Sequence, residues 1–274
     1  MDIKILIIAF GLTLFAGLST GIGGAIAFFA RKTNTKFLSV ALGFSAGVMV
    51  YISFTEILME AQSILSQELG RKPGMWTAAA AFFGGMFVIA LIDKLVPDFE
   101  NPHAMRTVED VRDTEPAGGQ DKSSRLYKVG LFTALAVGIH NFPEGFASFM
   151  STLRDPVLGV SIAAAIAIHN IPEGIAISMP VYYSTGSRSK ALYYSFVSGI
   201  SEPVGAILGY ILLSNFLTPV VFGIIFAAIA GIMVFISFDQ LLPTAREYGE
   251  HHLSIYGLVS GMIVMAISLL LFIN

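Results

Sequence analysis

One motif, His-Asn-x-Pro-Glu-Gly, occurs twice in this chain, in AVGIHNFPEGFASF at residues 136–149 and in AIAIHNIPEGIAIS at residues 165–178. Both copies are embedded in strongly apolar sequence, so a histidine, an asparagine and a glutamate fall in the middle of each apolar segment. Polar and ionisable side chains are costly inside a bilayer and usually functional where they occur there. These two segments are therefore the starting point for predicting both the fold and the function.

The composition is that of an integral membrane protein. Of the 274 residues, 55% are hydrophobic and 13% are charged, with a mean hydropathy of +0.75. A soluble domain carries about 25% charged residues. The chain has no cysteine, which excludes disulfides and thiolate metal ligands. The first apolar segment, 5–30, has no clear cleavage site after a short apolar core, so we interpret it as a retained helix.

Eight apolar segments are each long enough to cross about 30 Å of hydrocarbon as a helix. They lack the alternation of roughly ten-residue segments that is typical of a membrane β-barrel. The sequence thus predicts an all-α integral membrane protein with a single transmembrane domain, 1–274. The expected helices are 4–30, 37–62, 76–96, 127–152, 157–182, 190–214, 216–242 and 253–273. The long connection 98–126 is rich in Asp, Glu, Pro, Gly and Ser and is predicted to be a flexible cytoplasmic linker between helices 3 and 4.

The distribution of Lys and Arg predicts the orientation, because basic residues concentrate in cytoplasmic loops. The loops after the first, third, fifth and seventh helices, with the adjoining helix ends, contain twelve basic residues. The other side contains four, which are Lys4, Arg71, Lys72 and Arg154. The first set is therefore assigned to the cytoplasm, which puts both termini on the extracytoplasmic side of the cell (inner) membrane.

A second internal repeat links the second and seventh predicted helices. The similarity is close between residues 47–58, GVMVYISFTEIL, and residues 231–242, GIMVFISFDQLL. The predicted orientation makes these two helices run in opposite directions, as do the consecutive helices 4 and 5. This pattern predicts inverted repeats, helices 1–3 against helices 6–8 with helices 4 and 5 central, around a site near the midplane. Chance similarity between two apolar segments is the alternative.

Within each hexapeptide the histidine and the glutamate are four residues apart, so on a helix they share one face. The pairs are His140 with Glu144 and His169 with Glu173, flanked by Asn141 and Asn170. The proline of each copy removes one backbone hydrogen bond and leaves a carbonyl oxygen to be satisfied by protein or water. We expect the two polar faces to meet at similar depth.

Three buried carboxylates have to be neutralised. Glu144, Glu173 and Glu202 would each cost about 2.5–3.5 kcal/mol at a helix centre, on the order of 10 kcal/mol together. No Lys or Arg lies in the middle of a predicted helix, so a divalent cation or protons must compensate. Imidazole with carboxylate and amide oxygens suits Zn²⁺, Fe²⁺ and other first-row ions, whereas the lack of cysteine argues against Cu(I). We interpret Glu202 as a metal ligand or a proton acceptor. The alternative is that its carboxylate only makes hydrogen bonds within the protein.

Six further side chains have both a functional and a structural interpretation. Candidates for an entrance or an auxiliary ligand on the second helix are Glu56, Met49 and Glu60. Candidates for an exit path near the cytoplasmic end are Asp239, His251 and His252. The structural alternatives are a core position for the methionine, solvated or interfacial helix ends for the carboxylates, and a hydrated loop for the histidines.

The doubled hexapeptide resembles the signature of the ZIP (Zrt-, Irt-like) metal transporter family, and residues 53–56 and 231–234 resemble its bacterial branch. The resemblance covers nearly the whole chain. It implies a bundle of eight helices, with both termini outside, that imports divalent metal, and in which helices 2, 4, 5 and 7 take part in the movement. The chain departs from many relatives because its linker lacks a His-rich run, which gives no support to metal sensing there.

The same resemblance implies a metal site between helices 4 and 5 for one ion or two. The principal ligands that it implies are His140, Glu144, His169 and Glu173. A second ion would use Asn141, Asn170 and Glu202, with Glu144 and Glu173 shared. Glu56 lies where related bacterial importers place an acidic residue used for broader or iron substrates.

The leading hypothesis is a secondary transporter that imports Zn²⁺ and other divalent cations (Fe²⁺, Mn²⁺, Cd²⁺, Co²⁺), bound as substrates and not as catalytic cofactors. The alternative is an intramembrane zinc-dependent hydrolase, in which the same side chains would hold a catalytic Zn²⁺. The sequence has no His-Glu-x-x-His motif and no evident Ser-His-Asp set, which favours the transporter. The expected partners are divalent metal ions and the lipid bilayer, without nucleic acid; a homodimer is neither supported nor opposed.

Overall fold

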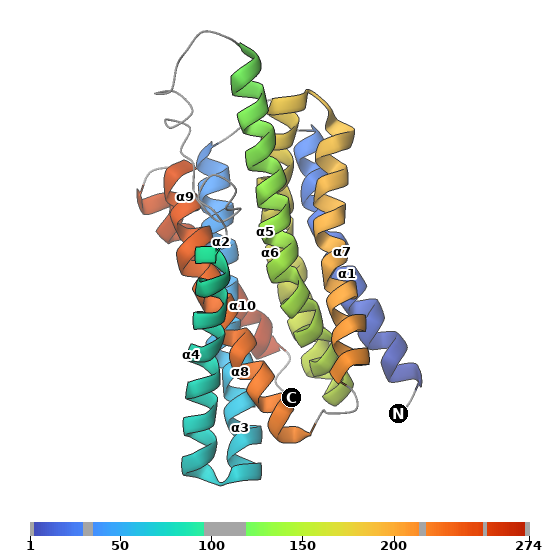
Figure 1. The fold of residues 1–274 in the computed structure, drawn as a ribbon, viewed down its shortest axis with the longest axis vertical. Coiled ribbons are helices and arrows are strands. Elements are labelled where there is room, and N and C mark those ends of the chain that lie inside the picture. Colours follow the sequence, from blue (N-terminus) through green and yellow to red (C-terminus); the bar gives the residue numbers. More distant parts are fainter. Residues whose placement is uncertain (1–2, 30–34, 96–118, 214–217, 249–250, 272–274) are drawn as a thin grey trace.

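The computed structural model describes residues 3–29, 35–95, 119–213, 218–248 and 251–271, and these ranges are almost entirely helical (Figure 1). No strand occurs in them, as the all-α prediction expects. The helices are α1 (Ile3–Phe29), α2 (Thr35–Ile52), α3 (Leu58–Leu69), α4 (Arg71–Leu95), α5 (Gly119–Arg154), α6 (Pro156–Thr185), α7 (Arg188–Leu213), α8 (Pro219–Ile236), α9 (Leu242–Tyr248) and α10 (His251–Leu271).

Seven stretches of the described helices are long and apolar enough to span a membrane, and they match every predicted helix except the fourth. At that place lies α5, whose 36 residues reach roughly 54 Å along the bundle (Figure 1). The eight-helix architecture is thus confirmed. α5 begins at Gly119, so it includes the end of the segment predicted to be a linker, whereas 96–118 lie outside the described residues.

Local sequence sets the short turns on either side of α6. The Asp155 side chain accepts a hydrogen bond from the backbone N–H of Val157 at 2.8 Å, and Pro156 occupies the first helical position, where no N–H is needed. Gly186 caps the C-terminal end of α6, and its φ of 64° lies in the left-handed region that favours glycine. These two tight turns hold α5, α6 and α7 against one another as antiparallel neighbours.

The second and seventh spans each widen into a π-helical turn at the same point of the internal repeat. The turn η1, Ser53–Ile57, separates α2 from α3, and η2, Ser237–Leu241, separates α8 from α9. In η1 the serine hydroxyl donates to the carbonyl of Met49 at 2.6 Å, and the same bond recurs in η2 to Met233 at 2.7 Å. The two spans run in opposite directions (Figure 1). The predicted inverted repeat is therefore present in the backbone itself.

The helices form two groups (Figure 1). The motif bundle consists of α1, α5, α6 and α7, which pack mainly on one another; the second bundle consists of α2, α3, α4, α8, α9 and α10. The bundles meet mainly where α2 packs on α6, with a smaller contact between α5 and α8. The family resemblance led us to expect a moving unit of helices 2, 4, 5 and 7. In this structure the hexapeptide helices pack with the first and sixth spans, and which helices move stays a prediction.

Glycines bring helices into backbone contact inside each bundle. A Cβ at Gly47 on α2 would overlap the carbonyl oxygen of Leu258 on α10, and a Cβ at Gly261 on α10 would overlap that of Phe44 on α2. Small residues at such places let membrane helices approach closely. Among the described glycines, the contacts of this kind lie within one bundle and none joins the two. Side chains, and not backbone contacts at glycine, therefore make up the surface between the bundles.

Candidate metal centre

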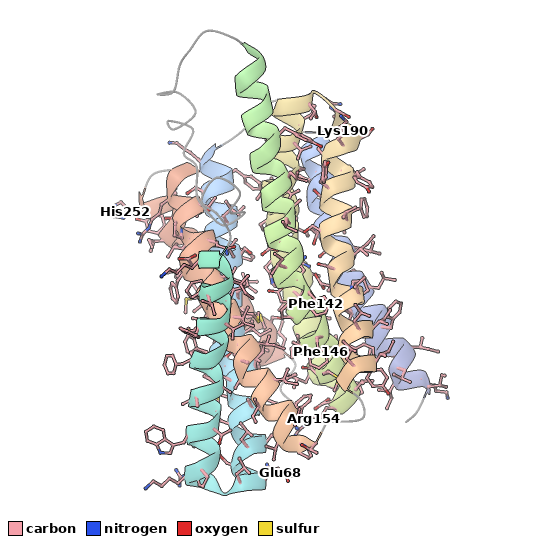
Figure 2. All side chains as sticks on the ribbon, in the orientation of Figure 1. Glu68, Phe142, Phe146, Arg154, Lys190 and His252 are labelled. Carbon is pink, nitrogen blue, oxygen red and sulfur yellow. The ribbon has the colours of Figure 1, made fainter. Side chains whose placement is uncertain are left out.

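The hexapeptides lie far from both ends of the molecule. Figure 2 shows Phe142, in the first copy, along the middle part of the bundle between the end marked by Lys190 and the end marked by Glu68. Both α5 and α6 continue as helices through their prolines, Pro143 and Pro172. The polar residues of the motif are thus carried to mid-depth on two unbroken helices.

The last residue of each hexapeptide brings a third helix against the motif. A Cβ at Gly145 would overlap the backbone carbonyl of Glu202 on α7, and a Cβ at Gly174 would overlap that of Thr20 on α1. A larger residue at either position would push these helices apart. The motif glycines therefore place Glu202 beside the first copy and α1 beside the second.

Three carboxylates are buried in this region. Glu144 on α5 is 1% exposed, and Glu173 on α6 and Glu202 on α7 are 0% exposed. The sequence has no Lys or Arg between 156 and 187 or between 191 and 245. Ionised carboxylates out of water are costly unless a positive charge compensates them. The centre therefore requires a positive charge that the middle of these helices does not contain.

His169 is fully buried, and each ring nitrogen faces an acceptor. Nδ1 lies 3.1 Å from the carbonyl oxygen of Ala165, which can only accept, so Nδ1 carries a proton. Nε2 lies 3.3 Å from Oε2 of Glu144. In a neutral imidazole this nitrogen presents a lone pair to the carboxylate, so the two groups repel unless a proton or a metal ion joins them. Two ligands of tetrahedral Zn²⁺, each about 2.0–2.1 Å from the metal, are about 3.3–3.4 Å apart. The observed separation fits such a pair.

Asn170 joins three helices of the motif bundle. Its amide nitrogen donates to the carbonyl oxygen of Ala16 on α1 at 2.9 Å and to Oε1 of Glu202 on α7. Oδ1 of Asn170 and Oε2 of Glu202 have no hydrogen-bond partner within the described ranges. One oxygen of Glu202 thus makes the internal hydrogen bond of the structural interpretation, and the role of the other oxygen as a ligand stays a prediction.

The first copy leaves more polar atoms without partners. Neither the amide nitrogen nor the amide oxygen of Asn141 has a hydrogen-bond partner in the part of the chain that the structure describes, and the same is true of Oε1 of Glu144. Buried polar atoms of this kind are rare in proteins and indicate a missing ligand, ion or water. With Asn170 and Glu202, the middle of the motif bundle offers four such oxygens together with the His169 imidazole. This donor set suits Zn²⁺ and Fe²⁺.

Ser45 on α2 is a residue that the sequence did not point to. Its hydroxyl lies 3.3 Å from Oε1 of Glu173 and 3.4 Å from the backbone carbonyl of His169. The buried helical serine of η1, Ser53, donates to its own helix. Ser45 instead reaches from the second bundle to a carboxylate of the motif bundle. A single serine in an apolar helix has no spacing signal, so only the packing of α2 on α6 shows this contact.

Comparison with known proteins identifies the family to which this arrangement belongs. Residues 98–269 match the family model described as ZIP Zinc transporter. The chain is 60% identical over 269 residues to "Zinc transporter ZupT" of Nitratidesulfovibrio vulgaris, with 97% of each chain covered. It is 60% identical over 271 residues to the protein of that name from Lysinibacillus sphaericus, with 99% of each covered. The chain belongs to the ZIP zinc transporter family.

Membership of the ZIP family confirms the resemblance that the doubled hexapeptide indicated, and it covers nearly the whole chain. It agrees with a multi-pass membrane protein, as the long apolar helices show. It gives no support to the intramembrane hydrolase that the donor set alone left open.

The ZIP motif is only partly visible in the structure. The side chain of His140 lies outside the described residues, so its predicted role beside Glu144 stays a prediction. Among the side chains that are described, no three His, Asp or Glu residues are gathered as a ready metal site. The described part of the centre is therefore one imidazole with carboxylates and amides from α5, α6 and α7.

The three entrance or auxiliary candidates of this ZIP protein have different surroundings. Met49 is fully buried in the apolar core, where its structural interpretation placed it. Glu56 is half-buried within η1. Glu60 forms an ion pair with Arg154 of α5, whose Nε lies 3.0 Å from Oε1, so it is more than a solvated helix end. A sequence argument could not have paired these two residues, because they lie on helices that are distant in the chain.

The three exit candidates lie away from the hexapeptides. Asp239 is exposed within η2. His252 is exposed and stacks on Tyr256, with ring centroids 6.2 Å apart, at the end of the molecule away from Glu68 (Figure 2). The side chain of His251 lies outside the described residues. Their predicted role in an exit path stays a prediction.

Proposed function

We propose that this protein is a secondary transporter that imports Zn²⁺, and also Fe²⁺, Mn²⁺, Cd²⁺ and Co²⁺, into the cytoplasm through the centre on α5 and α6. The observation that carries this proposal is the contact of His169 Nε2 with Glu144 Oε2 at 3.3 Å, while Nδ1 donates to a carbonyl. A cation resolves the meeting of two lone pairs and neutralises buried carboxylates. Zinc is also the metal in the names of both relatives.

The centre holds one ion or two, bound as substrate. The first ion would use His140, Glu144, His169 and Glu173. The second would use Asn141, Asn170 and Glu202, with Glu144 and Glu173 shared between the ions. Support for the second position comes from the unpartnered oxygens of the asparagines and of Glu202, which are buried and next to the first position.

The cation would move from the face that carries the α3–α4 turn to the opposite face. The sparse basic residues on the α3–α4 side favour an extracytoplasmic location for that face and for both termini. Glu56 would receive the cation on the way in. Asp239, His251 and His252 would receive it on the way out, at the end rich in Lys and Arg. The membrane is the cell (inner) membrane.

Uptake of ⁶⁵Zn²⁺ into proteoliposomes tests the proposal. We expect the double variant His140→Ala/His169→Ala to lose uptake, because both imidazole ligands are gone. His103→Ala removes the histidine of the predicted linker 98–126 and serves as the matched control, with uptake expected to be like that of the parent. Parental uptake by the double variant would show that the site is wrongly assigned.

Competition among Zn²⁺, Fe²⁺, Mn²⁺, Cd²⁺ and Co²⁺ in the same vesicles defines the substrate range. Metal ligands must be deprotonated to bind, so protons compete with the cation. We therefore expect uptake to fall as the external pH is lowered at a fixed metal concentration. Turnover of a peptide or lipid without metal flux would instead favour the hydrolase.

A further inference from the structure

Arg154, the last residue of α5, contacts two helices of the second bundle, α3 and α8, at one mouth of the molecule. Its Nε lies 3.0 Å from Oε1 of Glu60 on α3, and its guanidinium carbon lies 5.8 Å from the ring centroid of Phe222 on α8. The Arg154 side chain is 44% exposed and that of Glu60 is 26% exposed. One residue of the motif bundle is thus held by an ion pair and a cation–π contact to the second bundle.

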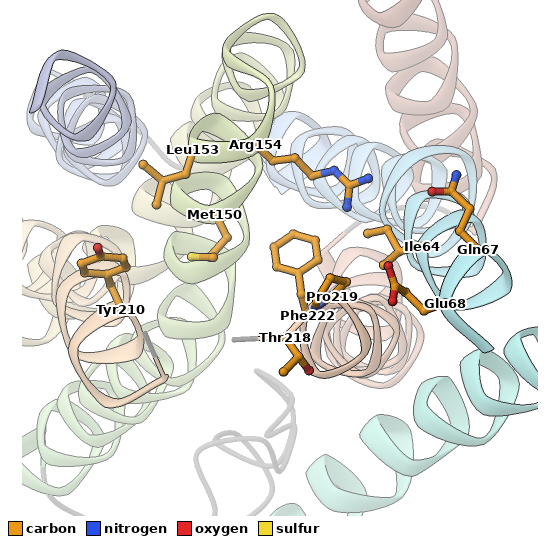
Figure 3. A pocket seen from close by; sticks show the side chains of 10 residues that line it. All are labelled: Ile64, Gln67, Glu68, Met150, Leu153, Arg154, Tyr210, Thr218, Pro219 and Phe222. Carbon is orange, nitrogen blue, oxygen red and sulfur yellow. The ribbon is translucent and has the colours of Figure 1, made fainter. Parts of the chain in front are cut away.

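Arg154 also lines a cavity between the two bundles. The backbones of α3 and α5 do not come together anywhere in the described ranges, so the long side chain of Arg154 bridges the gap. The cavity has a volume of about 540 Å³ and is lined by side chains from α3, α5, α7 and α8. Figure 3 shows Arg154 extending from α5 toward Ile64 and Glu68 of α3, with Phe222 beside it.

This mouth is on the side from which the proposed transport begins. It lies at the same end as the α3–α4 turn (Figure 2). Arg154 is ten residues beyond Glu144 on α5, which places it roughly 15 Å along the helix from the centre. Glu56, the proposed entrance carboxylate, precedes Glu60 by about one turn on the same span.

A guanidinium at this place opposes an incoming cation in two ways. It repels the cation through its own charge, and it occupies the carboxylate that would attract the cation. Arginine has five N–H donors and no lone pair, so it cannot itself become a metal ligand. The cation and Arg154 therefore compete for Glu60.

We propose that Arg154 is a positioning residue for cation uptake: it holds Glu60 beside this cavity, and an incoming divalent cation takes Glu60 over from it. When the cation binds Glu60, the ion pair that joins α5 to α3 is broken. This inference rests on the proposed direction of transport. An exposed ion pair shifts an equilibrium by only about two- to fivefold, which suits a contact that has to break in every transport cycle.

The two halves of the ion pair should have opposite effects on the KM for external Zn²⁺. Arg154→Gln leaves Glu60 free and removes the repelling charge, so we expect KM to fall about two- to fivefold. Glu60→Gln leaves Arg154 unpaired at the mouth, so KM should rise by a similar factor. A merely structural ion pair would shift KM in the same direction in both variants, and that result would overturn the proposal.

Two further variants separate charge from contact in the same assay. Arg154→Lys keeps the charge and can still reach a carboxylate, so KM should stay closer to the parent value than in Arg154→Gln. Lys72→Gln removes a positive charge from the same face, at the exposed start of α4. We expect no change in KM for Lys72→Gln; a fall equal to that of Arg154→Gln would assign the effect to general surface charge and contradict the proposal.

Access to the cavity can be followed without measuring transport. The chain has no cysteine, so Leu153→Cys, in the cavity wall, gives a single reactive thiol. We expect a membrane-impermeant maleimide to label it faster with Arg154→Gln added, and faster in the Leu153→Cys variant alone when Zn²⁺ is present. Zn²⁺ should have no such effect with Glu60→Gln added. Equal labelling rates in all cases would overturn the proposal even if Zn²⁺ uptake proceeds, and the expected rates would support it even if uptake fails.

Discussion

The two copies of the hexapeptide differ by one residue, yet their asparagines have different surroundings. Asn170 in the second copy donates to Ala16 and to Glu202, so it is part of the packing of α1, α6 and α7. Asn141 in the first copy makes no hydrogen bond with the described part of the chain, although it is fully buried. The same residue is therefore a structural anchor in the second copy and has an unpartnered side-chain amide in the first. The neighbouring helix decides which role a repeated residue takes.

The largest effect is expected where the two copies are alike. Gly145→Ala and Gly174→Ala each place a Cβ against a neighbouring backbone carbonyl, which cannot move without its helix. Overpacking costs about 1–3 kcal/mol and more where nothing can yield. We expect loss of most folded protein in both variants, measured as monodisperse protein after detergent extraction. Gly84→Ala on α4, where a Cβ meets nothing within 4 Å, is the matched control and should extract like the parent.

The second effect concerns the histidine that bridges the copies. His169→Ala removes the imidazole that faces Glu144 and leaves that carboxylate without its partner. We expect Zn²⁺ uptake to fall by about 100-fold or more, since removal of even an outer-shell partner of a metal ligand costs about 10- to 100-fold. Initial rates in proteoliposomes provide the measurement. A loss smaller than about threefold would mean that the first copy alone holds the cation.

Variants of the two asparagines distinguish a role in holding the helices together from a role in binding metal. Asn170→Ala leaves the Ala16 carbonyl and a Glu202 oxygen without their donor, which should lower the free energy of unfolding by about 1–3 kcal/mol. Asn141→Ala removes no hydrogen bond among the described residues, so the metal-free protein should unfold like the parent. Thermal unfolding in detergent with EDTA tests this difference.

Zn²⁺ should protect both variants less than the parent, because both asparagines are proposed as ligands of the second ion. Asn141→Ala is expected to gain less stability than the parent from added Zn²⁺, because a ligand is missing while the fold is intact. If the metal-free Asn141→Ala protein is as unstable as Asn170→Ala, the two asparagines are both anchors and the comparison fails.

The smallest effect is expected at the contact between the bundles. Ser45→Ala removes a hydroxyl 3.3 Å from Glu173 and should weaken Zn²⁺ binding a few-fold, up to about tenfold, because hydrogen bonds to charged groups are the stronger ones. Ser45→Thr keeps the hydroxyl and should bind Zn²⁺ close to the parent affinity. Isothermal titration in detergent measures both, and equal affinities for all three proteins would remove Ser45 from the centre.

Much of this fold could be predicted from the sequence because its signals are local. Apolar runs marked the membrane helices, and the similarity of residues 47–58 to 231–242 indicated the inverted repeat. The spacing of four between histidine and glutamate put both on one helix face, and the absence of central basic residues indicated a cation. Glu202 was identified for the same reason, as a carboxylate in the middle of an apolar segment.

The remaining features depend on which helices become neighbours. The contacts of Ser45 with Glu173 and of Arg154 with Glu60 join residues more than ninety positions apart, and no periodicity encodes such pairs. The grouping of α5 and α6 with α1 and α7 likewise follows from glycine contacts between helices distant in sequence. The π-helical turns were missed because neither SFTEI at 53–57 nor SFDQL at 237–241 contains a glycine or proline that would indicate an irregular helix.

The two π-helical turns also determine what a change in chain length would do. Each turn accommodates an additional residue within a helix, and one residue of an α-helix corresponds to about 100° of rotation. Deleting one residue from η1 would therefore leave a regular helix, but it would rotate everything beyond it by about a quarter of a circle. Glu60 would then face away from α5, while Ser45 would keep its place. Insertion or deletion of a single residue at η1 would therefore rotate α3 while α2 keeps its position.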